Sequence, residues 1–236
     1  MRATLEPGTK TRVTKSDTFY RNDIAVFDYY GEDYTSDPAS EGLRKSWQKW
    51  VFRMVAFSGD KVELKNGDLF INDRKADVAS TVLNQYKVAS TELLELPDNK
   101  LEDDFRVVGR DSGLYRYQCA FTAAEAEEYR QRKPAIVSVT RLLDPELPAL
   151  AFYCKDCQHS VDNWGPFIIP WPGDTVIVDN LEQSAFRNIP GVHNGKNLVK
   201  EKLYFVLGDN RHGAMDSRFI GLITASKMYG IVEMKR

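Results

Sequence analysis

Residues 203–221 read Leu-Tyr-Phe-Val-Leu-Gly-Asp-Asn-Arg-His-Gly-Ala-Met-Asp-Ser-Arg-Phe-Ile-Gly. The first five residues form an apolar run, which predicts a buried strand. The next eleven positions carry two Asp, two Arg, an Asn and a Ser. Because so many polar groups at the end of a strand need partners, we expect them to pair with one another or with a reacting group.

Strand patterns recur on both sides of this stretch. Runs rich in apolar residues predict strands over 23–27, 50–57, 136–139, 175–178 and 229–234. The pair Asn66-Gly67 between two short apolar runs predicts a tight hairpin. Residues 28–46 show no periodicity and predict a surface loop. The fold class expected from these patterns is mainly β.

The middle of the chain differs in character. Residues 79–96 and 123–132 have helical patterns, and Thr122 with Glu125 forms a capping-box signal at the start of the second helix. We therefore expect a β-rich core made of residues 1–75 and 166–236. Residues 76–165 would form an inserted, smaller α+β domain.

Composition excludes several classes of function. The 236 residues carry a formal net charge of −2, which gives no general electrostatic case for nucleic acid or an anionic membrane surface as partner. No stretch approaches 18 apolar residues, and no signal-peptide pattern opens the chain, so any membrane anchor would have to lie outside this chain.

Three cysteines are present, and two of them form the pair Cys154-Lys-Asp-Cys157. This pair is a disulfide candidate in an oxidising compartment, with two free thiols in a loop as the alternative. A zinc site would need two more ligands at matching spacing, and only His159 is near, so we expect no metal and no cofactor.

Several segments, in order, resemble the motifs of the type I signal peptidases, which are membrane-anchored serine proteases of the Ser-Lys class. The matching segments are Met1-Arg-Ala-Thr-Leu5 with Gly8, Arg21-Asn-Asp-Ile-Ala-Val-Phe27, Phe52-Arg-Met-Val-Ala-Phe-Ser-Gly-Asp-Lys-Val62 with the hairpin Asn66-Gly-Asp-Leu-Phe-Ile-Asn-Asp73, and Gly208–Arg218. The resemblance runs from residue 1 to residue 221, and residues 76–165 contain no matching motif.

The resemblance implies a serine nucleophile and a desolvated lysine base. The family lysine position is Phe52 in this chain, and the family serine that orients the lysine is Ala214. The nucleophile position falls one residue before Met1, and Ala3 replaces a family proline. Either the chain is cut within the first motif or Met1 is a true start. Neither alternative restores the lysine, so no catalytic dyad is intact within this sequence.

The remaining polar residues of the motifs predict a structural network of Arg53, Asp209, Asn210, Arg211, Asp216, Ser217 and Arg218. Our hypothesis is that Arg53 pairs with Asp216, because an unpaired buried arginine would be costly. His212 and His193 are interpreted as exposed loop residues rather than catalytic bases.

In the family, substrate adds as an extended strand, and the matching positions are Lys49, Trp50, Val51 and Phe52. Such pairing uses backbone hydrogen bonds and survives the loss of a base. The first hypothesis is a signal-peptidase-like protein without Ser-Lys protease activity that binds extended peptides, a preprotein or another subunit. The alternatives are an active signal peptidase with an unusual base, and a structural or interaction domain. Family resemblance implies the extracytoplasmic face of a membrane, or the periplasm, as its location.

Overall fold

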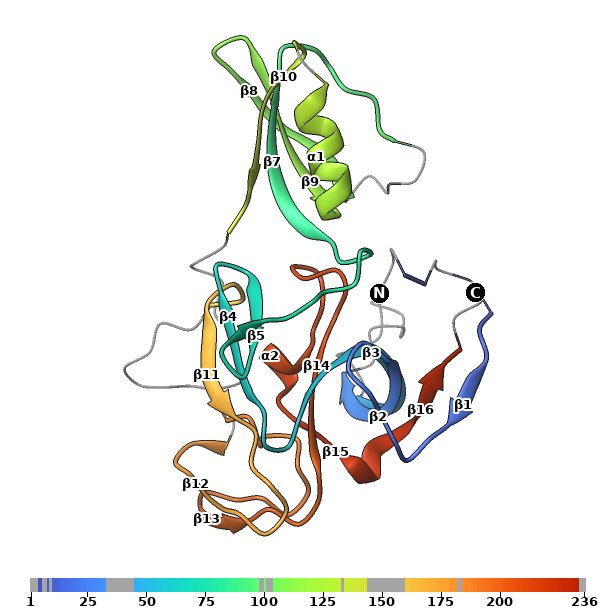
Figure 1. Cartoon of the computed structure of the whole chain (residues 1–236), viewed down its shortest axis with the longest axis vertical. Coiled ribbons are helices and arrows are strands. Elements are labelled where there is room, and N and C mark those ends of the chain that lie inside the picture. The colour runs from blue at the N-terminus through green and yellow to red at the C-terminus, as the bar shows by residue number, and fades with distance from the viewer. Residues whose placement is uncertain are drawn as a thin grey trace.

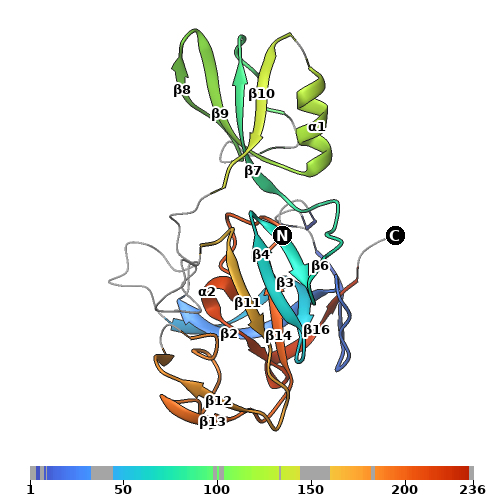
Figure 2. The ribbon, with the colours of Figure 1, turned by 60° about the vertical axis from the view of Figure 1, so that its left-hand side comes forward.

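The computed structural model describes residues 4–5, 8, 10–32, 45–97, 100, 104–132, 134–143, 160–181 and 184–233. Antiparallel β-sheets make up most of this structure, which confirms the mainly β fold class. Figures 1 and 2 both place one sheet with helix α1 at one end of the molecule, and the hairpin of β12 and β13 at the other. No helix within the described residues is long and apolar enough to cross a membrane.

The largest sheet has the strand order β1-β16-β2-β3-β14-β15. Its strands are β1 (Val13–Lys15), β2 (Ile24–Glu32), β3 (Lys45–Phe57), β14 (Leu203–Leu207), β15 (Ile223–Thr224) and β16 (Met228–Val232). Two short helical segments, α2 (Ser217–Ile220) and the 3-10 turn η3 (Ala225–Lys227), join its last three strands. All five residues of β14 are buried, as the apolar run predicted.

The prediction of a loop over residues 28–46 is wrong at both ends, because β2 and β3 extend into it. Cross-strand aromatic pairs accompany this extension. The rings of Tyr29 and Trp50 lie 4.1 Å apart between centroids, and those of Tyr30 and Trp47 lie 5.4 Å apart. Cross-strand aromatic pairs of this kind stabilise antiparallel strands. In the sequence, the polar residues beside these rings hide the strand pattern.

A second sheet has the order β11-β4-β5-β6 and packs with β14 around a shared apolar core. Its strands are β4 (Lys61–Lys65), β5 (Asp68–Ile71), β6 (Arg74–Lys75) and β11 (Trp164–Ile168). The predicted hairpin is confirmed, since Asn66 and Gly67 both have positive φ between β4 and β5. A separate pair, β12 (Thr175–Val178) and β13 (Gly195–Leu198), completes this part.

The third sheet, β10-β7-β9-β8, has its own buried cluster beneath α1. Its elements are β7 (Asn84–Ser90), β8 (Phe105–Asp111), β9 (Leu114–Phe121), α1 (Ala123–Gln131) and β10 (Ile136–Arg141). The capping box of Thr122 and Glu125 is confirmed. The helix predicted over residues 79–96 is wrong, because β7 pairs with both β9 and β10 and this pairing outweighs the local pattern.

The division of the chain into a core and an inserted domain stays a prediction. One detail of the boundaries differs from the structure. The predicted boundary at residue 165 falls inside β11, whose Trp164 is buried in the same cluster as Phe205 of β14.

Candidate functional site

The loop that follows β14 is held to β3 by a buried ion pair. The strands pair so that Leu207 lies opposite Arg53, which brings Arg53 beside the first residues of the loop. Nε of Arg53 lies 2.7 Å from Oδ1 of Asp209, and Nη2 lies 2.5 Å from Oδ2. Both side chains are buried, so the pair is a two-point contact shielded from water.

Asp209 also accepts hydrogen bonds from the hydroxyls of Thr4 and Thr81. Burial acts to raise the pKa of the Asp209 carboxyl, but the hydrogen bonds from Arg53 and Thr4 outweigh it, so its pKa lies below the ordinary value. The carboxylate is therefore ionised at neutral pH, and it ties three distant segments of the chain together.

The predicted pairing of Arg53 with Asp216 is wrong. Asp216 instead pairs with Arg218, with Nε–Oδ1 and Nη2–Oδ2 distances of 2.8 Å each. Asp216 caps α2, so the nearest guanidinium is the one two residues further along the same turn. Its Oδ2 also accepts the backbone N–H of Gly208 at 3.0 Å, which fixes the start of the loop.

Other predicted members of the network contribute through the backbone or bind the loop to neighbouring segments. Oγ of Ser217 accepts the N–H of Val206 at 2.9 Å. Arg218 donates to the carbonyl oxygens of Val161 and Arg211. Asn210 forms a parallel bridge with Leu83, so the loop also pairs with the segment that leads into β7.

The two positions at which this chain departs from the Ser-Lys motifs meet beside Gly208. A Cβ atom built on Gly208 would lie 2.2 Å from Cβ of Ala214 and 3.3 Å from Cε1 of Phe52. The Phe52 ring packs among other rings, with centroids 6.0 Å from Phe27 and 5.8 Å from Trp50. The site of the family base is thus filled by an aromatic cluster that neither accepts nor donates a proton.

Parts of the predicted site lie outside the described residues. Met1 to Ala3, next to the nucleophile position, are among them, and so is the disulfide candidate of Cys154 and Cys157. Thr4 is described, and its hydrogen bond to Asp209 places Thr4 itself beside the loop. No group of three or more metal-ligating side chains occurs in the described part.

The segment predicted to bind peptides lies on β3, and its pairing is one-sided. β2 pairs with β3 along the whole length from Lys45 to Arg53, whereas β14 pairs with β3 only from Arg53 to Phe57. Within the described strands, residues 45–52 therefore have no neighbour on the β14 side. Lys49 itself is engaged, with Nζ 2.8 Å from Oδ1 of Asp28 and 3.7 Å from the centroid of the Tyr229 ring.

The two histidines of interest differ in their surroundings. His193 is exposed, as predicted. The prediction that His212 faces solvent is wrong, because its side chain is 10% exposed and its Nε2 lies 3.1 Å from Oδ2 of the buried Asp162. No pattern in the sequence pointed to this partner, since Asp162 is fifty positions away in a segment without a motif.

A search of curated proteins found no match to this chain. A comparison with protein families did find a match, and it agrees with the geometry of the loop after β14. The family described as signal peptidase, peptidase S26, matches residues 1–235. This range includes the ion-paired loop, the strand with Phe52 and the whole segment between them. The chain belongs to the signal peptidase S26 family.

Proposed function

We propose that this chain is a signal-peptidase-like protein that lacks Ser-Lys protease activity and binds extended peptides along β3. The observation that carries the proposal is the meeting of Phe52 and Ala214 beside Gly208. A Ser-Lys protease needs an amine that takes the proton of the nucleophile. A benzyl side chain has no group that does so, and an orienting hydroxyl has no task without the amine.

Lys49 is not positioned to replace the missing base. It lies three residues before Phe52, so along a strand its side chain points to the opposite face of the sheet. Its ammonium group is also held by Asp28 and by the Tyr229 ring.

The retained charges support a structural role for residues 208–216, which follow β14 and precede α2 and are called the signature loop. The ion pairs Arg53–Asp209 and Asp216–Arg218 are each complete without any contribution from the side chains at positions 52 and 214. Removing one member would leave a buried unpaired charge, so selection for stability alone would keep them.

Peptide binding is supported by the one-sided pairing of β3. Along an antiparallel strand, alternate residues direct their N–H and C=O groups to opposite edges. The edge of residues 45–52 that faces away from β2 can therefore accept an added strand. The partner would be an extended peptide, a preprotein or a segment of another subunit. The protein would act at the extracytoplasmic face of a membrane, as its family resemblance implies.

Peptide binding is tested with a labelled extended peptide derived from a signal sequence. We expect Phe52→Glu to weaken binding, because it puts a charge beside the open edge. The matched control is Ile177→Glu, at a position 76% exposed on β12, which should leave binding unchanged. Equal loss in both variants, or no binding by the wild-type chain, would contradict this part and favour a structural domain.

A working protease with a different base is the second candidate, and the pair of His212 and Asp162 favours it. An Asp–His pair orients an imidazole in many serine proteases. His212 lies two residues before Ala214, in the same loop. Preprotein cleavage by the full-length protein that disappears in His212→Gln would support this candidate over the first.

A further inference from the structure

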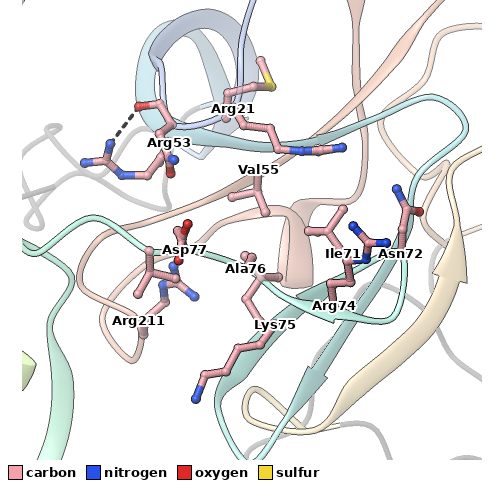
Figure 3. Close-up of a pocket in the computed structure, with 14 residues that line it drawn as sticks. Arg21, Arg53, Val55, Ile71, Asn72, Arg74, Lys75, Ala76, Asp77 and Arg211 are labelled. Carbon is pink, nitrogen blue, oxygen red and sulfur yellow. Dashed lines mark hydrogen bonds between the residues drawn. The ribbon is translucent and has the colours of Figure 1, made fainter.

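A cavity of about 490 Å³ opens beside the ion-paired loop. Figure 3 shows its labelled side chains, which come from β3, from the β5–β6 hairpin and its continuation, from the signature loop and, in the case of Arg21, from the turn before β2. Its charged lining residues are Arg21, Arg53, Arg74, Lys75, Asp77 and Arg211. Five of these six are cationic, although the chain as a whole is slightly acidic. The cavity is thus an electropositive recess on a protein of the opposite net charge.

Three of the five cations already have carboxylate partners. Arg53 pairs with Asp209, Arg21 lies 2.7 Å from Asp60, and Lys75 lies 2.6 Å from Asp68. Arg74 and Arg211 make no ion pair with any residue that the structure describes. Among the described lining residues Asp77 is the single acid, and it is exposed.

Arg211 is the unusual member of this group. The residue is 4% exposed, and its Nε is buried without a hydrogen-bond partner. Its guanidinium donates no hydrogen bond to another described residue. Burying a charged donor without a partner costs roughly several kcal/mol of folding free energy, and folded proteins normally avoid this cost.

The backbone of Arg211 is nevertheless fixed. Its N–H donates to the carbonyl oxygen of Leu83 at 3.1 Å, and its own carbonyl oxygen accepts from Arg218. The loop therefore holds the side chain at the cavity wall before any ligand arrives, which lowers the entropic cost of binding.

The charges around Arg211 do not neutralise it. Burial and the nearby charge of Arg218 lower its pKa to about 10, and Asp216 and Asp209 act against this shift. Those two carboxylates are already bound to Arg218 and Arg53. At neutral pH the Arg211 guanidinium is still charged, and no carboxylate in the described ranges pairs with it alone.

We propose that this cavity binds a small molecule that carries a phosphate group, with Arg211 and Arg74 as its principal ligands. A carboxylate offers one charge and two oxygens in a plane, which suits a single guanidinium. A phosphate offers up to two charges and oxygens in several directions, so it can serve cations on different walls of one cavity. The volume of the cavity falls within the usual range for small-ligand sites. This site does not depend on the peptide-binding proposal.

The test measures, by calorimetry, the affinity of the full chain for glycerol 3-phosphate and for inorganic phosphate. Sodium chloride is added so that all samples have the same ionic strength. A third sample contains vesicles with phosphatidic acid, which distinguishes a lipid headgroup from a soluble ester. We expect the wild-type chain to bind both glycerol 3-phosphate and inorganic phosphate. Arg74→Gln should weaken that binding about tenfold, the effect of one lost charge-assisted contact. Binding to vesicles alone would overturn the proposal of a soluble ligand.

Arg211→Met should abolish binding while keeping a side chain of similar length. In phosphate-free buffer this variant should be at least as stable as the wild-type chain, because it removes an unpaired buried charge. Arg106→Gln is the control, since Arg106 is an exposed arginine on β8, outside the cavity lining. The proposal is overturned if the wild-type chain binds no phosphate at equal ionic strength, or if folded Arg211→Met binds as the wild type does. Should Arg211→Met fail to fold, unchanged affinity in Arg74→Gln overturns it instead.

Discussion

Arg53 and Asp209 form a buried two-point contact between β3 and the signature loop. Replacing Arg53 by Met would leave the Asp209 carboxylate buried with only two hydroxyl partners. We expect a loss of about 3–5 kcal/mol in the free energy of unfolding, measured by denaturant titration.

The matched control for that change is Arg116→Met. Arg116 pairs with Asp111 at the surface, where both side chains are well exposed, so its loss should cost no more than about 1 kcal/mol. Equal destabilisation by the two substitutions would contradict a buried Arg53–Asp209 pair.

Asp209 also makes a prediction about acid stability. Its pKa is lowered in the folded chain, so its contribution to stability is complete above the unfolded pKa of about 3.9 and is lost as pH falls through the lower folded value. The unfolding free energy should therefore decrease below about pH 4. Asp209→Asn should lower stability at neutral pH but make this acid-side decrease shallower. A variant that loses stability with the same acid slope as the wild type would contradict the shift.

Gly208 tests the close approach of Phe52 and Ala214. In Gly208→Ala the new methyl group would fall 2.2 Å from Cβ of Ala214, so the loop would have to move, at a cost of about 1–3 kcal/mol. Gly109→Ala adds the same group to β8, where nothing lies within 4 Å, and should change stability by less than about 0.5 kcal/mol. Thermal unfolding of the two variants gives the comparison, and similar melting temperatures would count against this geometry.

At the same scale, the sequence motifs singled out Phe52, Ala214, Arg53 and Asp209 as signature positions but did not predict which of the charged residues pair with one another. The choice of Asp209 over Asp216 depends on the register of β3 and β14, which shifts between Phe205 and Val206. A bulge of this kind leaves no trace in a hydrophobic pattern.

Among the elements, local sequence signals predicted those that are specified by residues close together in the chain. The Asn66-Gly67 hairpin and the capped helix α1 are confirmed, because turn and cap residues act within a few positions. Strand β7 was mistaken for a helix, and the β8–β9 hairpin was not predicted, because their stability comes from partners far along the chain. The exposed residues of β8 also conceal its alternation.

The capping box of α1 allows a test at this scale. The hydroxyl of Thr122 accepts the N–H of Glu125, and the Glu125 carboxylate accepts the N–H of Thr122. Thr122→Ala should cost about 1 kcal/mol, while Thr122→Ser, which keeps the hydroxyl, should cost less. Chemical denaturation followed by circular dichroism measures both, and equal effects would show that the hydroxyl contributes nothing.

For the whole molecule, the family motifs from Arg21 onward lie in the part of the chain formed by residues 10–75 and 160–233, on the strands of two sheets and in the loop after β14. The Arg53–Asp209 pair, the edge of β3 that has no described neighbour, and the cationic cavity lie in the same part. The β10-β7-β9-β8 sheet carries no such motif, and its separate core is consistent with the predicted inserted domain. The sequence could not predict the cavity, because Arg211 and Arg74 come together only when the β5–β6 hairpin and the signature loop fold beside each other.

We propose that the replacement of the family lysine by Phe52, together with Ala214, removes protease activity from a protein of the signal peptidase family. The most direct measurement is preprotein cleavage by the full-length protein, compared with a double variant that carries Phe52→Lys and Ala214→Ser. We predict no cleavage by the wild-type protein and a gain of cleavage in the double variant where a serine occupies the position before Met1. Wild-type cleavage that vanishes when that upstream serine is mutated would contradict the claim.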